Sequence, residues 1–171
     1  LVGAEIELVS ILGRETVLKR SLLELEDPYR YILIDCPPSL GLLTLNALAA
    51  AQSILIPIQC EFYALGGLSQ LLSTVRLVQK SLNSSLEIEG VLLTMLDGRL
   101  NLAKQVEEEA RKYFQAKVYR TSIPRNVRLA EAPSFGKPIL RYDKLSQGAR
   151  SYVALAEELM GTREAPTYEG N

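Results

Sequence analysis

Three short apolar runs constrain the fold of this chain more than any other feature of its sequence. They occupy residues 31–34, 54–58 and 91–96, and none shows the polar alternation of a half-exposed strand. A strand that is apolar on both sides needs both faces covered, as in a parallel sheet. We therefore expect three buried strands, although Pro57 in the second run lacks a ladder N–H and by itself favours an edge position.

Helical patterns accompany the runs. Apolar residues recur at three- and four-residue spacing over 65–78 and 149–159, and another helix is expected from Asn101, as its N-cap, to about residue 114. We expect the first 25 residues to be helical and a shorter strand near Val118. Alternating strands and helices are typical of right-handed βαβ units. The sequence thus predicts an α/β fold, a layered domain with a mostly parallel sheet flanked by helices.

The length of 171 residues fits one domain, which we expect over residues 1–161, followed by a disordered tail at 162–171. The longest apolar stretch, 40–51, falls short of the roughly 20 residues that a membrane span needs. We therefore expect no transmembrane helix. The chain begins without Met, which suggests a fragment.

Cysteine and histidine usage narrows the chemistry. Cys36 and Cys60 are the only cysteines and there is no His, so the sequence supports neither a Cys/His zinc site nor a disulfide framework. The two thiols could meet, but we expect buried free thiols in a reducing cytosol. An iron–sulfur site is disfavoured because Cys36 has no suitable second ligand.

Charge is distributed unevenly along the chain. Residues 111–144 hold nine Lys and Arg but only two acids, Glu131 and Asp143, for a net charge of +7. The remainder holds ten bases and eighteen acids, for a net charge of −8. The basic stretch is either a solvated face or a surface for an anionic partner such as nucleic acid.

Asp35 is the first candidate for ligand chemistry, because ligands of open α/β sheets bind beyond the carboxyl ends of the strands. It follows the apolar run 31–34 directly. An acid at this place can hold Mg²⁺ through a water, as in a Walker B arrangement. It can equally cap the next turn.

Four strings of residues give a more specific signal. They are DCPPSLGLLT at 35–44, PIQCEFYAL at 57–65, LLTMLDGR at 92–99 and IPRNVRLAEAPS at 123–134. In this order and spacing they resemble the ParA/Soj family of chromosome- and plasmid-partitioning ATPases, which carry a deviant Walker A P-loop. The resemblance covers about residues 1–160. It implies a P-loop NTPase-like fold from which the N-terminal strand and the P-loop are missing.

The resemblance also implies the roles of single residues. Asp35 would be catalytic and would hold Mg²⁺ through a water, and Pro37 and Pro38 would stiffen the switch loop that senses the γ-phosphate. The adenine of ATP would be held by Met95, Asp97, Pro124 and Asn126. For Met95 the alternative is core packing, and for Asn126 it is the N-cap of a short helix.

Two arginines match positions that the family uses against DNA, Arg99 and Arg128. The alternative is that each forms a surface ion pair, Arg99 with Asp97 and Arg128 with Glu131. The partners that the resemblance implies are nonspecific double-stranded DNA, a second copy of the chain in an ATP-bound homodimer, and a centromere-binding ParB-like protein. It implies a cytoplasmic, nucleoid-associated protein without a membrane partner.

The sequence departs from the family in places. No G-x-x-x-x-G-K-[ST] pattern occurs anywhere, Gly66 stands where relatives often have Glu, and Leu100 stands where they often have Thr. The competing interpretation is a truncated, catalytically inactive remnant that acts at most as a binding module. A MinD-like membrane-associated relative is disfavoured, because residues 161–171 contain no amphipathic basic helix.

Overall fold

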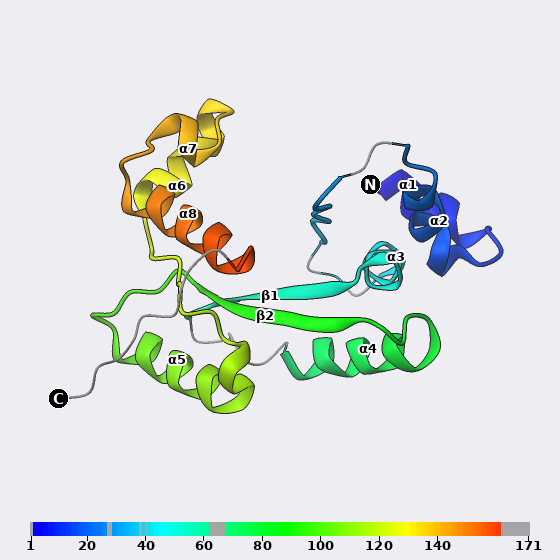
Figure 1. The fold of residues 1–171 in the computed structure, drawn as a ribbon, viewed down its shortest axis with the longest axis horizontal. Coiled ribbons are helices and arrows are strands. Elements are labelled where there is room, and N and C mark those ends of the chain that lie inside the picture. Colours follow the sequence, from blue (N-terminus) through cyan, green and yellow to red (C-terminus); the bar gives the residue numbers. More distant parts are fainter. Residues whose placement is uncertain (1, 27–28, 38, 40, 62–67, 162–171) are drawn as a thin grey trace. The chain divides into compact units, whose positions relative to one another are not determined.

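The computed structural model describes residues 2–26, 29–37, 39, 41–61 and 68–161. The chain divides into two compact units, one of Leu1–Ile54 with Gly66–Glu89 and one of Leu55–Leu65 with Gly90–Asn171 (Figure 1). The single domain expected over 1–161 stays a prediction. The expected disordered tail at 162–171 lies outside the described residues.

The first unit begins with helices, as expected. These are α1 (Val2–Val9), the 3-10 helix η1 (Arg14–Thr16) and α2 (Val17–Leu23), and the next helix along the chain is α3 (Leu42–Ala50). In Figure 1, α1 and α2 lie beside α3.

Asn46 on α3 joins these helices through its side-chain amide. It is 3% exposed, and its Nδ2 donates to the carbonyls of Arg14 (2.7 Å) and Leu42 (2.9 Å). Its Oδ1 accepts from the backbone N–H of Leu18 at 3.1 Å. One buried side chain therefore satisfies backbone groups of η1, α2 and α3 together.

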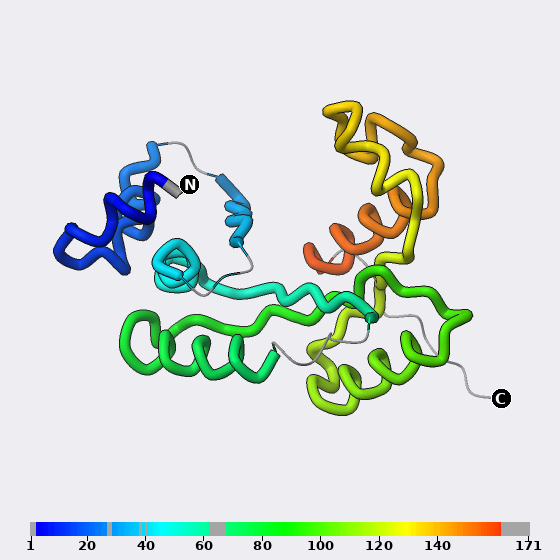
Figure 2. The backbone as a smooth tube through the Cα atoms, turned by 180° about the vertical axis from the view of Figure 1, so that it is seen from behind, coloured from blue at the N-terminus to red at the C-terminus, as the bar shows by residue number. Residues whose placement is uncertain are grey.

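The sheet of the described residues consists of β1 (Ser53–Gln59) and β2 (Glu87–Thr94). The N–H of Glu87 donates to the carbonyl of Gln52 (3.1 Å), and the N–H of Cys60 donates to that of Thr94 (2.9 Å). Both strands therefore advance in the same direction, and the predicted parallel pairing is confirmed. Figure 2 shows the two strands side by side in cyan and green.

Pro57 fits into β1 because of the phase of this ladder. Backbone groups of alternate residues point to the same neighbour, so Gln52 and Cys60 place the even-numbered residues of β1 toward β2. Pro57 is odd-numbered, and its missing N–H removes no β1–β2 hydrogen bond. Its side chain is exposed, whereas Ile56 and Ile58 are buried. The prediction of cover on both faces is therefore wrong for β1.

The strand predicted at 31–34 is also wrong. These residues adopt no regular structure, and Leu33 is 86% exposed. A strand forms only where a neighbour accepts and donates its ladder hydrogen bonds, and the described residues supply no strand beside this segment. Apolar composition alone does not provide that partner.

Helix α4 (Leu68–Ser81) covers the first unit's end of the sheet and agrees with the helix predicted over 65–78, of which 65–67 lie outside the described residues. Asn83, just after α4, donates through Nδ2 to the carbonyls of Leu48 (3.0 Å) and Ala51 (2.7 Å) at the end of α3. One core cluster of this unit consists of Leu48, Val75, Val78 and Leu86.

The second unit continues with α5 (Asn101–Phe114) and the 3-10 helix η2 (Gln115–Lys117). The bounds of α5 are as predicted, but its N-cap is Leu100 rather than Asn101, which already lies in the first turn. Near Val118 the structure has a single parallel bridge to Val91 instead of a strand. One core cluster here consists of Leu92, Ile123 and Leu155.

Four helical segments complete this unit. They are α6 (Val127–Glu131), the 3-10 helix η3 (Ala132–Phe135), α7 (Ile139–Tyr142) and α8 (Gln147–Leu159). A Cβ at Gly148 of α8 would stand 2.5 Å from Cγ of Leu129, so glycine allows α6 and α8 to pack closely. None of the described helices is long and apolar enough to cross a membrane.

Candidate functional site

The candidate nucleotide-contact residues lie on two paired segments where β2 ends. The N–H of Leu96 donates to the carbonyl of Ile123 (3.1 Å), and the N–H of Arg125 donates to the carbonyl of Leu96 (3.2 Å). Residues 95–97 therefore run beside residues 123–126. The structure thus brings together the predicted set of Met95, Asp97, Pro124 and Asn126.

Met95 is an extra residue in this ladder. Ile123 donates to the carbonyl of Leu93 (2.8 Å) and accepts from the N–H of Leu96 (3.1 Å). In a regular parallel ladder the two partners of one residue are two positions apart, whereas Leu93 and Leu96 are three apart, so one residue is extra. The φ of Met95 is 54°, in the left-handed region that residues with a side chain rarely adopt. The bulge at Met95 shifts the phase of the chain, and its side chain is 36% exposed. Core packing does not account for it.

Asp97 and Arg99 form a closed ion pair after the bulge. Arg99 donates through Nε to Oδ1 of Asp97 (2.9 Å) and through NH2 to Oδ2 (2.6 Å), while its backbone N–H also reaches Oδ1 (3.1 Å). The hydrogen bonds from Arg99 lower the pKa of Asp97 to about 2. The ion pair that was the alternative for Arg99 is therefore present. The Arg99 side chain remains 89% exposed.

Asn126 is the N-cap of α6, so the alternative to an adenine contact that the sequence left open for this residue is present. Its Oδ1 accepts from the backbone N–H of Leu129 at 3.3 Å. Pro124, two residues earlier, is half-buried beside Leu96. The cap fixes the start of α6 and with it the place of Arg128 in the first turn.

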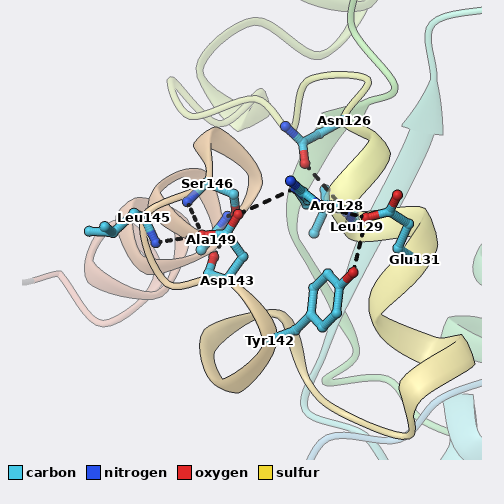
Figure 3. A network of polar contacts seen from close by, with 9 residues as sticks. All are labelled: Asn126, Arg128, Leu129, Glu131, Tyr142, Asp143, Leu145, Ser146 and Ala149. Atoms are coloured by element: carbon cyan, nitrogen blue, oxygen red, sulfur yellow. Dashed lines mark hydrogen bonds and ion pairs between the residues drawn. The ribbon is translucent and has the colours of Figure 1, made fainter.

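Arg128 is held by two carboxylates (Figure 3). Its NH1 donates to Oε2 of Glu131 at 3.0 Å, and its Nε lies 3.5 Å from Oδ2 of Asp143. The hydroxyl of Tyr142 donates to the same Oε2 of Glu131 at 3.0 Å. Hydrogen bonding and charge from Glu131 raise the pKa of Arg128 further, so the guanidinium stays protonated. The Glu131 pair was predicted as an alternative, whereas Asp143 and Tyr142 were not.

Asp35 and Pro37 belong to the first unit and are described by themselves. Asp35 is exposed and Pro37 half-buried, in a segment without helix or strand. Pro38 lies outside the described residues. A single exposed carboxylate suits Mg²⁺, which keeps several waters and binds few protein oxygens. Within the described ranges no cluster of three or more His, Cys, Asp or Glu side chains could hold a metal.

The two cysteines are free. Cys60 is buried as predicted, and burial together with the nearby Glu107 raises its pKa to about 11. Cys36 is exposed, so the prediction of a buried thiol is wrong there. Residues 31–33, earlier in the same segment, are exposed as well, and the described part of the chain places no strand beside them.

Sequence reasoning missed two acids that organise the loops around the site. Glu61 accepts from Arg125 at 3.1 Å, and Glu158 of α8 accepts from the backbone N–H groups of Arg120 (2.7 Å) and Thr121 (2.9 Å). These pairs join positions 37 to 64 residues apart. No local sequence pattern predicts such long-range contacts. An acid on an otherwise apolar helix face is a weak indication that the acid has a buried partner.

A parallel pair of strands flanked by helices, with candidate ligand groups at the strand ends, makes this an α/β protein, and its solved structural neighbours place the fold in the P-loop NTPase-like class. The solved structure of cobyrinic acid a,c-diamide synthase from Mycobacterium smegmatis matches 99% of this chain and 64% of that chain, with a TM-score of 0.75 and 34% identity. A second structure of that enzyme, with bound ADP and magnesium, matches with a TM-score of 0.73 and 34% identity.

Sequence comparison narrows this class. The family described as "AAA domain" matches residues 1–88. The sporulation initiation inhibitor protein Soj of Bacillus subtilis is 66% identical over 159 residues, which are 93% of this chain and 63% of that protein. The chromosome partitioning protein ParA of Myxococcus xanthus is 60% identical over 166 residues, 97% of this chain and 58% of that protein. The chain belongs to the ParA/Soj family of AAA-domain proteins, and it spans less than two thirds of the length of these relatives.

Proposed function

We propose that this chain is the larger part of a chromosome- or plasmid-partitioning ATPase. Its ATP-bound homodimer binds double-stranded DNA without sequence preference, and a centromere-binding ParB-like partner regulates hydrolysis. The observation that carries the proposal is the pairing of residues 95–97 with 123–126, because it supports one base-binding edge with a candidate DNA arginine after each segment. The 66% identity to Soj of Bacillus subtilis supports the same function.

The base-binding edge combines apolar and polar groups. The exposed thioether of Met95 and the ring of Pro124 offer flat apolar contact to adenine. Asn126 uses Oδ1 for its helix cap, and its NH₂ group is the donor that we propose for the base. Asp97, like any carboxylate of ordinary pKa, is ionised at neutral pH, and Arg99 lowers its pKa to about 2, so it can accept from an exocyclic amine.

Binding of the ATP phosphates requires more than Asp35. In proteins of this class Mg²⁺ neutralises charge on the phosphates. Asp35 is the carboxylate that we propose to hold its water shell, with Pro37 and Pro38 limiting the motion of the loop that follows. The sequence contains no G-x-x-x-x-G-K-[ST] loop, and this observation favours the second candidate function, a binding module without turnover. Reading the gene upstream of Leu1 separates the two.

Met95→Gly separates a base contact from a structural role. Glycine tolerates positive φ, so we expect the variant to keep or gain stability, by up to about 1 kcal/mol, while ATP affinity falls several-fold. Thermal unfolding and titration with a fluorescent ATP analogue measure the two effects. Gln115→Gly is the matched control, because Gln115 also has positive φ (51°) but lies after α5. Unchanged nucleotide affinity in Met95→Gly would remove this residue from the site.

DNA binding tests the proposed function directly. This chain, joined to the part of the Bacillus subtilis relative outside the match, is titrated with duplexes of unrelated sequence at several salt concentrations with ATP present. Arg99→Ala and Arg128→Ala should each lower affinity several-fold and reduce the salt slope by about 0.9 for each lost phosphate contact. Arg76→Ala, an exposed arginine on α4, is the control. Equal affinities and slopes in all four proteins would rule out both arginines as DNA contacts. If Arg99 and Arg128 contact DNA, we propose that the protein associates with the nucleoid in the cytoplasm.

A further inference from the structure

The basic stretch 111–144 contains nine cations and two acids, and both acids converge on one arginine. Glu131 binds NH1 of Arg128 at 3.0 Å, and Asp143 lies 3.5 Å from its Nε. Of the other eight cations, Arg111, Arg120 and Arg125 pair with acids that lie outside the stretch, namely Glu107, Glu158 and Glu61. The arginine proposed to contact DNA is thus the one on which the local negative charge is concentrated.

Both carboxylates are themselves held in place (Figure 3). Tyr142 donates its hydroxyl to Oε2 of Glu131 at 3.0 Å, and its ring stacks on Phe135 with 5.1 Å between centroids. Oδ1 of Asp143 accepts from the backbone N–H groups of Leu145 (3.2 Å) and Ser146 (3.1 Å). The acids therefore remain beside the guanidinium instead of rotating into solvent.

We propose that Glu131 and Asp143 compete with DNA phosphate for Arg128 and so limit the DNA affinity of this face. The inference rests on the proposed function. Two carboxylates against one guanidinium leave a local charge of −1 where a phosphate would approach. The Arg128 side chain is 54% exposed, and ion pairs this exposed are weak, so phosphate can displace the carboxylates at a cost in affinity.

The geometry leaves room for this exchange. A guanidinium carries five N–H donors in a planar fork, and the two ion pairs involve NH1 and Nε. Arg99 has a similar restraint from Asp97 alone. The two candidate DNA arginines thus differ in the number of carboxylates that hold them, and removing acid charge should affect the Arg128 side of the surface most.

The test compares Glu131→Gln and Asp143→Asn with Glu108→Gln, a control that removes one exposed acid on α5. Affinity for a duplex of arbitrary sequence is measured by fluorescence anisotropy over a range of salt concentrations. The full chain is used alone and joined to the unmatched part of the Bacillus subtilis relative with ATP. Each substitution at Glu131 or Asp143 should raise affinity about three- to fivefold beyond the control and steepen the salt slope. Both amides retain an acceptor oxygen, so Tyr142, Leu145 and Ser146 keep a partner.

The same substitutions in an Arg128→Ala background decide how the effect arises. If the carboxylates act through Arg128, the gain disappears in that background. A gain that persists there, or that equals the gain of Glu108→Gln, reflects general charge and overturns the proposal, and so does a loss of affinity in folded protein. If Arg128→Ala by itself leaves DNA binding unchanged, the proposed DNA contact fails instead. Thermal unfolding of each variant confirms that folded proteins are compared.

Discussion

Replacing Asp35 by alanine should lower ATP turnover by at least about a hundredfold in a protein that joins this chain to the unmatched part of the Bacillus subtilis relative. The reason is that Asp35 is the proposed carboxylate for the Mg²⁺ water shell, and no neighbouring acid cluster among the described residues could replace it. Phosphate release at saturating ATP and Mg²⁺ measures the effect. The 171-residue chain alone should show no turnover above background, because it contains no phosphate-binding loop pattern.

Stability provides the control for this prediction. Asp35 is exposed, so Asp35→Ala should change the free energy of unfolding by no more than about 0.5 kcal/mol. Glu24→Ala, at an exposed acid at the end of α2, should affect neither property. If Asp35→Ala lost cooperative unfolding while its folded fraction turned over ATP normally, Asp35 would be a structural cap rather than a Mg²⁺ residue.

Asn46→Ala should destabilise the first unit by about 2–4 kcal/mol. The substitution leaves the carbonyl of Arg14 and the N–H of Leu18 without their side-chain partner in a site where Asn46 is 3% exposed. Each buried polar group that loses its partner costs about 1–3 kcal/mol. Urea unfolding followed by circular dichroism measures the change in the free energy of unfolding.

Asn46→Asp and Asn101→Ala define the limits of that measurement. The aspartate keeps the shape of Asn46 but faces two carbonyl oxygens with a carboxylate, so it should be at least as damaging as alanine. Asn101 is exposed in the first turn of α5, and its replacement by alanine should change little. A loss below about 1 kcal/mol for both Asn46 variants would show that water satisfies these backbone groups.

The helices and the parallel pair could be predicted because their signals are local. The apolar spacing in α4 and α8, the cap residue near the start of α5 and the apolar runs of β1 and β2 each lie within one segment. The strand expected at 31–34 could not be decided locally, because strand formation depends on a neighbour from elsewhere. The cap of α5 was misplaced by one residue, which is the usual uncertainty of a helix end.

The residues of the candidate site could be predicted from the sequence, but their geometry could not. The set around Met95 and Asn126 came from motif resemblance, and the structure places its members on paired segments. The bulge at Met95 depends on which residue of β2 pairs with Ile123. The second ion pair of Arg128 depends on Asp143, which lies fifteen positions further along the chain. Both features arise from strand register and helix packing, which the residue types of a motif do not determine.

The phase of Pro57 in β1 has a consequence for the behaviour of the chain in solution. The edge of β1 that faces away from β2 has no N–H at Pro57, the fifth of the seven residues of the strand. A strand from another molecule that added there would leave one of its carbonyls without a donor within the new ladder. Proline at such an edge opposes strand-by-strand growth into aggregates, so the residue that looks least suited to the strand helps to keep the sheet from extending between molecules.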